Sequence, residues 1–289
     1  MFSTRLRLPR TSAALSLRLG LRPAAVHSRR SLHSVPELPH SSYSKDGIPN
    51  LMSPDGFKLA WTDYMTFTLD KLNALVVGTE LEDKTPKSIA LMTAREPSQA
   101  AIFNYASMAH NNHFFFANIH PTGTPMPDAL RRDLEASFSS IETLRREFIL
   151  TAGAMFGPGF LWLVKAGPGQ YRFLTTYLAG SPYPGAHWRA QAVDMNALGN
   201  QGSATAQMRS QVLGGRARGA GSSQAELPPG GVDLRPLLCL NTWEHAWLMD
   251  WGIGAKGSGG KVAFAAAWWD HIDWEKVAAD SGIERGKYL

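Results

Sequence analysis

The sequence predicts an α+β fold, with helices first and a small antiparallel sheet with further helices after them. Three observations predict this order. Apolar residues recur at the helical period through the first half of the chain. Short apolar runs bounded by glycine and proline begin after residue 157, and one more helical stretch closes the chain.

The first half starts with an extended lead-in, residues 35–50, which is rich in Pro, Ser and His. Residues 53–77 form the first predicted helix. Ser53 suits the N-cap, and Pro54 suits the first turn, where a missing N–H costs nothing. Apolar residues follow at helical spacings: Leu59, Met65, Leu69 and Leu72. A loop that contains Pro86 is expected next.

A second helix is predicted over residues 97–117, which begin at Pro97 and are rich in aromatic residues. Three prolines then mark a linker: Pro121, Pro125 and Pro127. A third helical stretch, residues 127–152, carries apolar residues on one side: Leu130, Leu134, Phe138, Ile141, Leu144 and Phe148. We therefore expect an N-terminal helical hairpin domain, residues 35–120, and a C-terminal α/β domain, residues 121–289.

Three strands are predicted in the second half, over residues 160–164, 171–178 and 234–240. The turn at 167–169 makes the first two antiparallel. Residues 195–231, which separate the second and third strands, are rich in Gly, Ser, Ala and Gln and are expected to be a flexible insertion. The last predicted helix spans residues 260–279, which include three tryptophans.

Residues 1–34 differ from the rest of the chain. They hold seven arginines, many Ser and Leu residues, and no Lys, Asp or Glu. This composition is typical of a mitochondrial transit peptide, with cleavage expected near Arg30 or Ser31. The alternative is a disordered basic tail that binds nucleic acid. The single cysteine, Cys239, excludes an intramolecular disulfide and a zinc site built from several thiolates.

Removal of this leader changes the charge of the protein. The full chain has 29 basic and 24 acidic residues, a net charge of +5. Without the seven leader arginines, 22 basic and 24 acidic residues remain, so the mature chain has a charge of about −2. Net charge therefore does not predict broad binding to nucleic acid. The longest apolar runs are far too short to span a membrane.

Four stretches resemble the iron/manganese superoxide dismutase family. Residues 237–247, with Trp243, Glu244 and His245, look like the family's D-x-W-E-H-A-Y-Y motif after a strand. Residues 111–121 are similar to its N-H-x-x-F-W segment that ends at a proline. The other two stretches are 157–163, similar to G-S-G-W-x-W-L, and 267–277, similar to the terminal I-W-x-x-I-N-W-x-x-V.

The resemblance covers residues 50–289 except the insertion, and it implies the fold of that family. The enzymes of the family hold iron or manganese with three His and one Asp. Carried over by motif, these positions fall on Ala60, Asn112, Asn241 and His245. Because alanine offers no lone pair and neutral amides are weak ligands for these metals, the resemblance implies no cofactor and no dismutase activity.

A different alignment would change one of these positions. His113 is adjacent to Asn112, and His110 is two residues before it, so a slip of one residue could recover one histidine. On a helix each step rotates a side chain by about 100°, so His113 is expected to point elsewhere. The other interpretation places His110, His113 and His120 on a polar helix surface.

A mitochondrial member without a metal site resembles the two superoxide dismutase-like proteins of the fungal mitochondrial small ribosomal subunit (37S). That resemblance implies a structural role in mitochondrial translation, with small-subunit ribosomal proteins, a second superoxide dismutase-like subunit and small-subunit rRNA as partners. Trp243, Glu244 and His245 would form the dimer interface, as in the family. The insertion offers candidate rRNA contacts: Arg209, Arg216 and Arg218.

Two other functions remain open at this stage. One is a mitochondrial iron or manganese superoxide dismutase, which the missing ligands oppose. The other is a pseudoenzyme that pairs with an active dismutase as a regulator. Bound metal would favour the first, and co-purification with free dismutase instead of ribosomes would favour the second.

Overall fold

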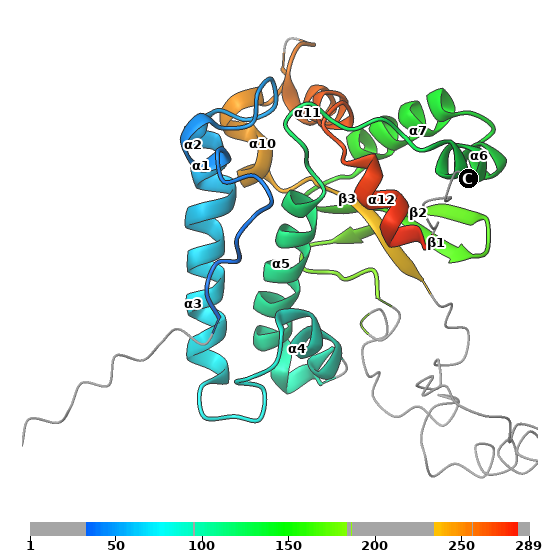
Figure 1. Ribbon diagram of the computed structural model, residues 1–289. Helices are drawn as coiled ribbons and strands as arrows, with labels where there is room; N and C mark the ends of the chain where they lie inside the picture. The colour runs from blue at the N-terminus through cyan, green and yellow to red at the C-terminus, as the bar shows by residue number, and fades with distance from the viewer. Residues whose placement is uncertain (1–32, 95, 184–185, 187–233, 256, 283–289) are drawn as a thin grey trace, which may run out of the picture. The chain divides into compact units, whose positions relative to one another are not determined.

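The structure is a computed structural model that describes residues 33–94, 96–183, 186, 234–255 and 257–282 (Figure 1). Helices come first, three antiparallel strands follow, and helices close the described chain, so the predicted α+β order is confirmed. Residues 1–32 of the predicted leader and the whole predicted insertion, 195–231, lie outside the described residues.

The first long helical element contains three segments without a break: α2 (Pro54–Phe57), the π-helical turn η1 (Lys58–Asp63) and α3 (Tyr64–Val76). The predicted helix over 53–77 is therefore confirmed. Ser53 is the N-cap, and its hydroxyl accepts a hydrogen bond from the Gly56 amide at 3.0 Å. The predicted extended lead-in contains a short helix, α1 (Tyr43–Asp46), whose Tyr43 side chain is buried.

The expected loop at Pro86 is wrong, because Pro86 begins helix α4 (Pro86–Thr93). Thr85 caps this helix by accepting a hydrogen bond from the Ser88 amide at 3.2 Å, and proline is well tolerated at the first helical position. A 3₁₀ turn, η2 (Pro97–Gln99), leads into α5 (Ala100–Ala117), as predicted for the second helix. In Figure 1, α5 lies between α3 and the sheet, and it contacts both.

The third predicted helical stretch is two helices, α6 (Asp128–Phe138) and α7 (Ile141–Ala154). The chain breaks at Ser139, which has a positive φ of 69°. Ser140 then caps α7, and its hydroxyl accepts a hydrogen bond from the Thr143 amide at 3.0 Å. The prediction of one helix over 127–152 is wrong. The apolar residues keep their helical spacing across Ser139, but the helix ends there and Ser140 begins the next one.

The sheet contains β1 (Gly159–Gly167), β2 (Gln170–Tyr177) and β3 (Arg235–Asn241), in the order β2-β1-β3. Both pairs are antiparallel, so the predicted small antiparallel sheet is confirmed. The central strand β1 places Phe160 opposite Asn241 and Trp162 opposite Cys239. Trp162 is fully buried, and its indole N–H donates to Thr176 Oγ1 at 3.0 Å.

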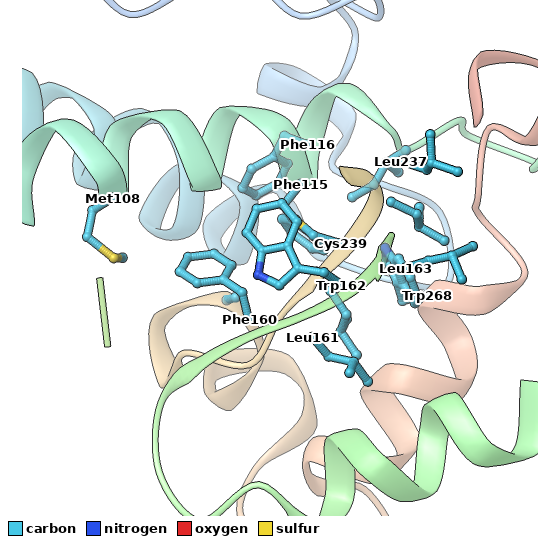
Figure 2. Close-up of a cluster of buried hydrophobic side chains, with 14 of the residues drawn as sticks. Met108, Phe115, Phe116, Phe160, Leu161, Trp162, Leu163, Leu237, Cys239 and Trp268 are labelled. Atoms are coloured by element: carbon cyan, nitrogen blue, oxygen red, sulfur yellow. The ribbon is translucent and has the colours of Figure 1, made fainter. Parts of the chain in front are cut away.

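Aromatic side chains from distant segments meet around β1 and form the core (Figure 2). Phe115 and Phe116 come from α5, Phe160 and Trp162 from β1, and Trp268 from a C-terminal helix. All five are completely buried. Burial of such rings contributes several kcal/mol each, so this cluster fixes the position of α5 against the sheet.

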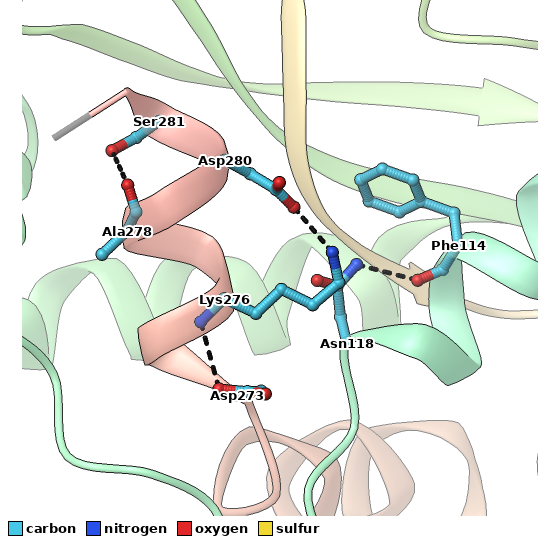
Figure 3. A network of polar contacts seen from close by, with 7 residues as sticks. All are labelled: Phe114, Asn118, Asp273, Lys276, Ala278, Asp280 and Ser281. Carbon is cyan, nitrogen blue, oxygen red and sulfur yellow. Dashed lines mark hydrogen bonds and ion pairs between the residues drawn. The ribbon is translucent and has the colours of Figure 1, made fainter. Parts of the chain in front are cut away.

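The C-terminal part has three helices: α10 (Glu244–Trp251), α11 (Gly260–Trp269) and α12 (Trp274–Ser281). Helix α10 has no counterpart among the predicted elements. The prediction of one helix over 260–279 is wrong, because Asp273 begins a new helix. Its carboxylate accepts a hydrogen bond from the Lys276 amide at 3.1 Å (Figure 3). No helix in the described part of the chain is both long enough and apolar enough to cross a membrane.

Candidate functional site

Three of the four positions suggested by the resemblance meet in the interior. Ala60 lies in the π-helical turn η1, Asn112 on α5, and Asn241 at the end of β3. The Asn112 amide donates to the Ala60 carbonyl oxygen at 3.1 Å, and the Asn241 amide donates to Asn112 Oδ1 at 2.9 Å. All three residues are completely buried. The three segments are therefore joined by a continuous chain of hydrogen bonds, which we call the amide chain.

The amide chain continues into the backbone of the next segment. Asn241 Oδ1 accepts a hydrogen bond from the Trp243 amide at 2.9 Å. Both side-chain oxygens of the chain thus accept a hydrogen bond, and both side-chain amides donate one. Buried amides without partners would cost free energy, so this pairing stabilises the contacts between the three segments.

These residues do not fit the iron or manganese that the fold family implies. Ala60 has no donor atom, and each Asn oxygen is neutral and already accepts a hydrogen bond. Within the part of the chain that the structure describes, no group of three or more His, Cys, Asp and Glu side chains is arranged to hold a metal ion.

The fourth position, His245, is in a different environment from the other three. Its ring stacks on Tyr64, with centroids 3.9 Å apart and an angle of 10° between the planes. Its Nε2 atom is buried and has no hydrogen-bond partner among the described residues. Burial lowers the pKa of His245 to about 4, so the imidazole is neutral near pH 7.

Tyr64 is a residue that the sequence analysis missed. It lies at the start of α3, four residues after Ala60, and burial raises the pKa of its hydroxyl to about 12. The spacing of about one helical turn from Ala60 is the signal that could have identified it. The His245 ring has a second aromatic neighbour in Trp243, with ring centroids 5.8 Å apart.

His113 and His110 lie on other faces of α5. His113 faces Trp61, with ring centroids 5.9 Å apart, and burial lowers its pKa. His110 Nε2 lies 3.0 Å from the Tyr183 hydroxyl, and burial lowers the His110 pKa to about 3. His110 is thus half-buried on α5 and contacts the Tyr183 hydroxyl. In the described part of the chain, neither imidazole makes a hydrogen bond to the amide chain.

The segment Trp243–His245, which we call the rim segment, leads from the buried Asn241 to the surface. The Trp243 indole N–H donates to the Leu178 carbonyl oxygen at 3.3 Å, and Glu244 is exposed at the start of α10. Glu244 lines a hollow of about 550 Å³ with Phe156, Ile253 and other residues. Phe156 is 97% exposed and Ile253 is 76% exposed.

Trp243 lines a second hollow, of about 770 Å³, on the surface between α3 and β2. Exposed apolar side chains line this hollow too, including Phe67, Tyr177 and Leu178. Contiguous apolar surface of this kind marks interaction sites. The rim segment therefore borders two apolar hollows. The other predicted contacts, Arg209, Arg216 and Arg218, lie outside the described residues.

Comparison with known proteins agrees with this geometry. Residues 184–280 match the iron/manganese superoxide dismutases, C-terminal domain. The chain is 28% identical to the small ribosomal subunit protein mS43 of Schizosaccharomyces pombe, over 85% of this chain and 82% of that protein. It is 26% identical to mS42 of the same organism, over 67% of this chain and 72% of that protein.

Superoxide dismutases that carry iron are similar over a comparable length. The enzyme of Salmonella typhimurium is 24% identical, over 84% of this chain and 96% of the enzyme. The α+β order, the three-stranded antiparallel sheet and the match of the C-terminal domain agree with one another. The chain is therefore similar to the iron/manganese superoxide dismutases, by its C-terminal domain and, at lower identity, over most of its length.

Proposed function

We propose that this chain is a structural protein of the mitochondrial small ribosomal subunit and supports mitochondrial translation. The observation that carries the proposal is its similarity to mS43 and mS42, at 28% and 26% identity over most of the chain. Both relatives are named as small ribosomal subunit proteins. The chain is located in the mitochondrial matrix, which agrees with the arginine-rich leader in its sequence.

The proposal includes the absence of dismutase activity. Three of the four ligand positions, Ala60, Asn112 and Asn241, hold residues that bind iron or manganese weakly or not at all. The amide chain supports this, because it satisfies the polar atoms of Asn112 and Asn241 without a cation. Superoxide disproportionation requires a metal that alternates between two oxidation states, and a retained His245 alone does not hold one tightly.

A protein partner is proposed to cover the rim segment. The mature charge of about −2 gives no general attraction to phosphate, so apolar contacts have to supply much of the binding. Phe156 and Ile253 beside Glu244 offer such contacts. We propose that a second superoxide dismutase-like subunit docks here and that the pair binds the small subunit. Arg209, Arg216 and Arg218 are proposed as local contacts to rRNA phosphates.

Sedimentation of the tagged chain from lysed mitochondria tests this function. Quantitative mass spectrometry of the gradient fractions should find the chain together with small-subunit proteins. A chain that stays at the top of the gradient contradicts the ribosomal role. If it is found there with an active dismutase, the regulator hypothesis replaces it. A high-salt wash of the small-subunit fraction distinguishes apolar docking, which salt does not weaken, from phosphate contacts, which it does.

A further inference from the structure

The two edges of the three-stranded sheet are protected to different degrees. The order β2-β1-β3 makes β2 and β3 the edge strands (Figure 1). Strand β3 begins with Arg235 and Pro236, a charge and a proline that discourage further pairing, and it packs against α5 and α12. The end of β2, residues 173–177, has neither a charge nor a proline, and both Thr175 and Tyr177 are exposed.

The backbone amides of Thr175 and Tyr177 point away from β1. Tyr171 shows this direction, because its amide donates to Ser137 Oγ of α6 at 3.2 Å. Groups of alternate residues in a strand face the same neighbour, so the amides at 175 and 177 and the Thr175 carbonyl oxygen share the direction of the Tyr171 amide. Among the described residues, neither the Thr175 amide nor the Tyr177 amide has an acceptor on this side. This end of β2 is therefore an open edge.

The open edge borders the hollow of about 770 Å³ between α3 and β2, which we call the β2 hollow. Phe67 of α3, Tyr105 and Met108 of α5, and Trp243 are among the side chains that line it. None of the described residues that line it carries a charge. A chain that pairs with β2 would direct every second side chain to this face of the sheet. The β2 hollow therefore suits apolar, uncharged side chains on such a chain.

The open edge ends at a residue in an unusual backbone conformation. Leu178 has a positive φ of 52°, which is uncommon for a side chain of this size. Its amide donates to the Pro158 carbonyl oxygen at 3.0 Å, and its carbonyl oxygen accepts from the Trp243 indole N–H at 3.3 Å. These contacts hold an exposed leucine side chain beside the β2 hollow. Backbone strain of this kind gathers at binding surfaces.

We propose that the end of β2 binds an extended segment of another protein, which adds a fourth strand to the sheet and places apolar, uncharged side chains in the β2 hollow. Main-chain hydrogen bonds to Thr175 and Tyr177 supply the affinity, and the hollow supplies the selectivity. A charged segment binds poorly, because burial of its charges against this lining leaves them unpaired. The inference rests on the edge of the sheet and does not depend on the ribosomal role, so the two can fail separately.

The first test measures amide exchange, residue by residue, in the purified full chain without any partner. Thr175 and Tyr177 should exchange at least about tenfold faster than Leu174 and Thr176, whose amides face β1. Equal protection of all four amides at every protein concentration would mean that this chain covers its own edge. Protection that rises with protein concentration would mean that a second copy covers it. Either result overturns the proposal.

The second test adds a synthetic peptide of alternating valine and threonine, with a lysine at each end for solubility. Bound peptide should slow the exchange of Thr175 and Tyr177 by at least about tenfold. The same peptide with every second amide N-methylated should have no effect, because it cannot complete the strand pairing. A peptide with glutamate in place of valine should also have none. Exchange that the first peptide does not slow, or that all three slow equally, overturns the proposal.

A variant tests the edge itself. Thr175→Pro removes an outward N–H, and proline is tolerated in an edge strand where that N–H faces solvent. It should weaken binding of the valine–threonine peptide by about tenfold or more. Thr175→Val, which keeps the amide and the shape of the side chain, is the matched control and should bind within about twofold of the wild type. Thermal unfolding checks that both variants fold.

Equal peptide binding by folded Thr175→Pro and the wild type would overturn the proposal. If Thr175→Pro does not fold, the comparison of the plain and N-methylated peptides on the wild-type protein decides the question.

Discussion

The amide chain ends at Asn241, two residues before the rim segment, but the two differ in how their polar atoms are satisfied. In the amide chain, the side chains of Asn112 and Asn241 bind each other and neighbouring backbone groups, and all are buried. In the rim segment, Glu244 is exposed and His245 Nε2 has no hydrogen-bond partner among the described residues. The buried amides of Asn112 and Asn241 are paired with each other and with backbone groups, whereas the rim segment presents polar and apolar groups at the surface.

The largest expected effect concerns metal content. The protein purified from mitochondria should contain far less than one iron or manganese ion per chain. It should not disproportionate superoxide, because two amides and an alanine are poor ligands for these metals. Elemental analysis together with an activity assay checks this. A value near one metal ion per chain would show that the buried site does hold a cation.

A restored site sharpens the same test. The triple variant Ala60→His, Asn112→His and Asn241→Asp returns imidazole and carboxylate donors to positions that the structure brings together. Its metal content should rise towards one per chain, whereas Asn112→His alone should leave it near the wild-type value.

The next effect is on stability, from breaking the amide chain. Asn112→Ala removes the partner of the Ala60 carbonyl oxygen and of the Asn241 amide, both buried. Each unpaired group costs about 1–3 kcal/mol, so the variant should lose roughly 3–5 kcal/mol of unfolding free energy. Denaturant unfolding measures it. Asn104→Ala on the exposed face of α5 is the control, with a loss below about 0.5 kcal/mol.

Acid should weaken the fold through His245. Burial lowers its pKa in the folded state to about 4, below the value of about 6.5 expected in the unfolded chain. As the pH falls from 6.5 to 4, the unfolded chain takes up a proton that the folded chain does not. Folded stability should therefore decrease over this range, by about 3 kcal/mol from this group.

The variant His245→Phe keeps an aromatic ring against Tyr64 but removes the group that can take up a proton. Unfolding curves at several pH values should therefore show a smaller loss for this variant between pH 6.5 and 4. Part of the loss should remain, because burial also lowers the pKa of His110, to about 3. An unchanged slope in His245→Phe would mean that His245 is not titrating as its burial implies.

The smallest effect on stability, and a selective effect on assembly, is expected at Glu244. Because its carboxylate is exposed, Glu244→Ala should change the unfolding free energy by less than about 0.5 kcal/mol. If it pairs with a partner, its loss should cost about 1–3 kcal/mol of binding and lower the fraction found with small subunits. Glu147→Ala, an exposed acidic position on α7, is the control and should assemble normally.

Sequence reasoning succeeded for the fold where local chemistry and tertiary structure agree. Ser53 and Pro54 predict the start of a helix, and the apolar run that begins at residue 160 predicts a buried strand. It failed at Ser139 and at Asp270–Asp273, where apolar spacing continues across a break. The caps Ser140 and Asp273 create those breaks, and their side chains are recognisable in the sequence as helix starts. Pro86 was misjudged because proline suits both a loop and a first helical turn.

The site was less predictable than the fold. Motif spacing identified Ala60, Asn112 and Asn241, but their hydrogen bonds join residues 52 and 129 positions apart. Such contacts depend on how α5 packs between α3 and the sheet, which no local pattern encodes. The stacking of His245 on Tyr64 is of the same kind. Local sequence therefore predicts which residues gather, and tertiary packing decides how they bind one another.

Phe156 affects how this protein has to be produced. It is an aromatic side chain that is 97% exposed in the connection between α7 and β1, next to Gly157, which has a positive φ of 99°. Before assembly, every newly imported copy presents this ring to the crowded matrix, where similar surfaces adhere to one another. If the chain assembles with partners as proposed, its synthesis should match their supply, and surplus copies should be short-lived. Cells would then control the amount of this protein relative to the amount of its partners.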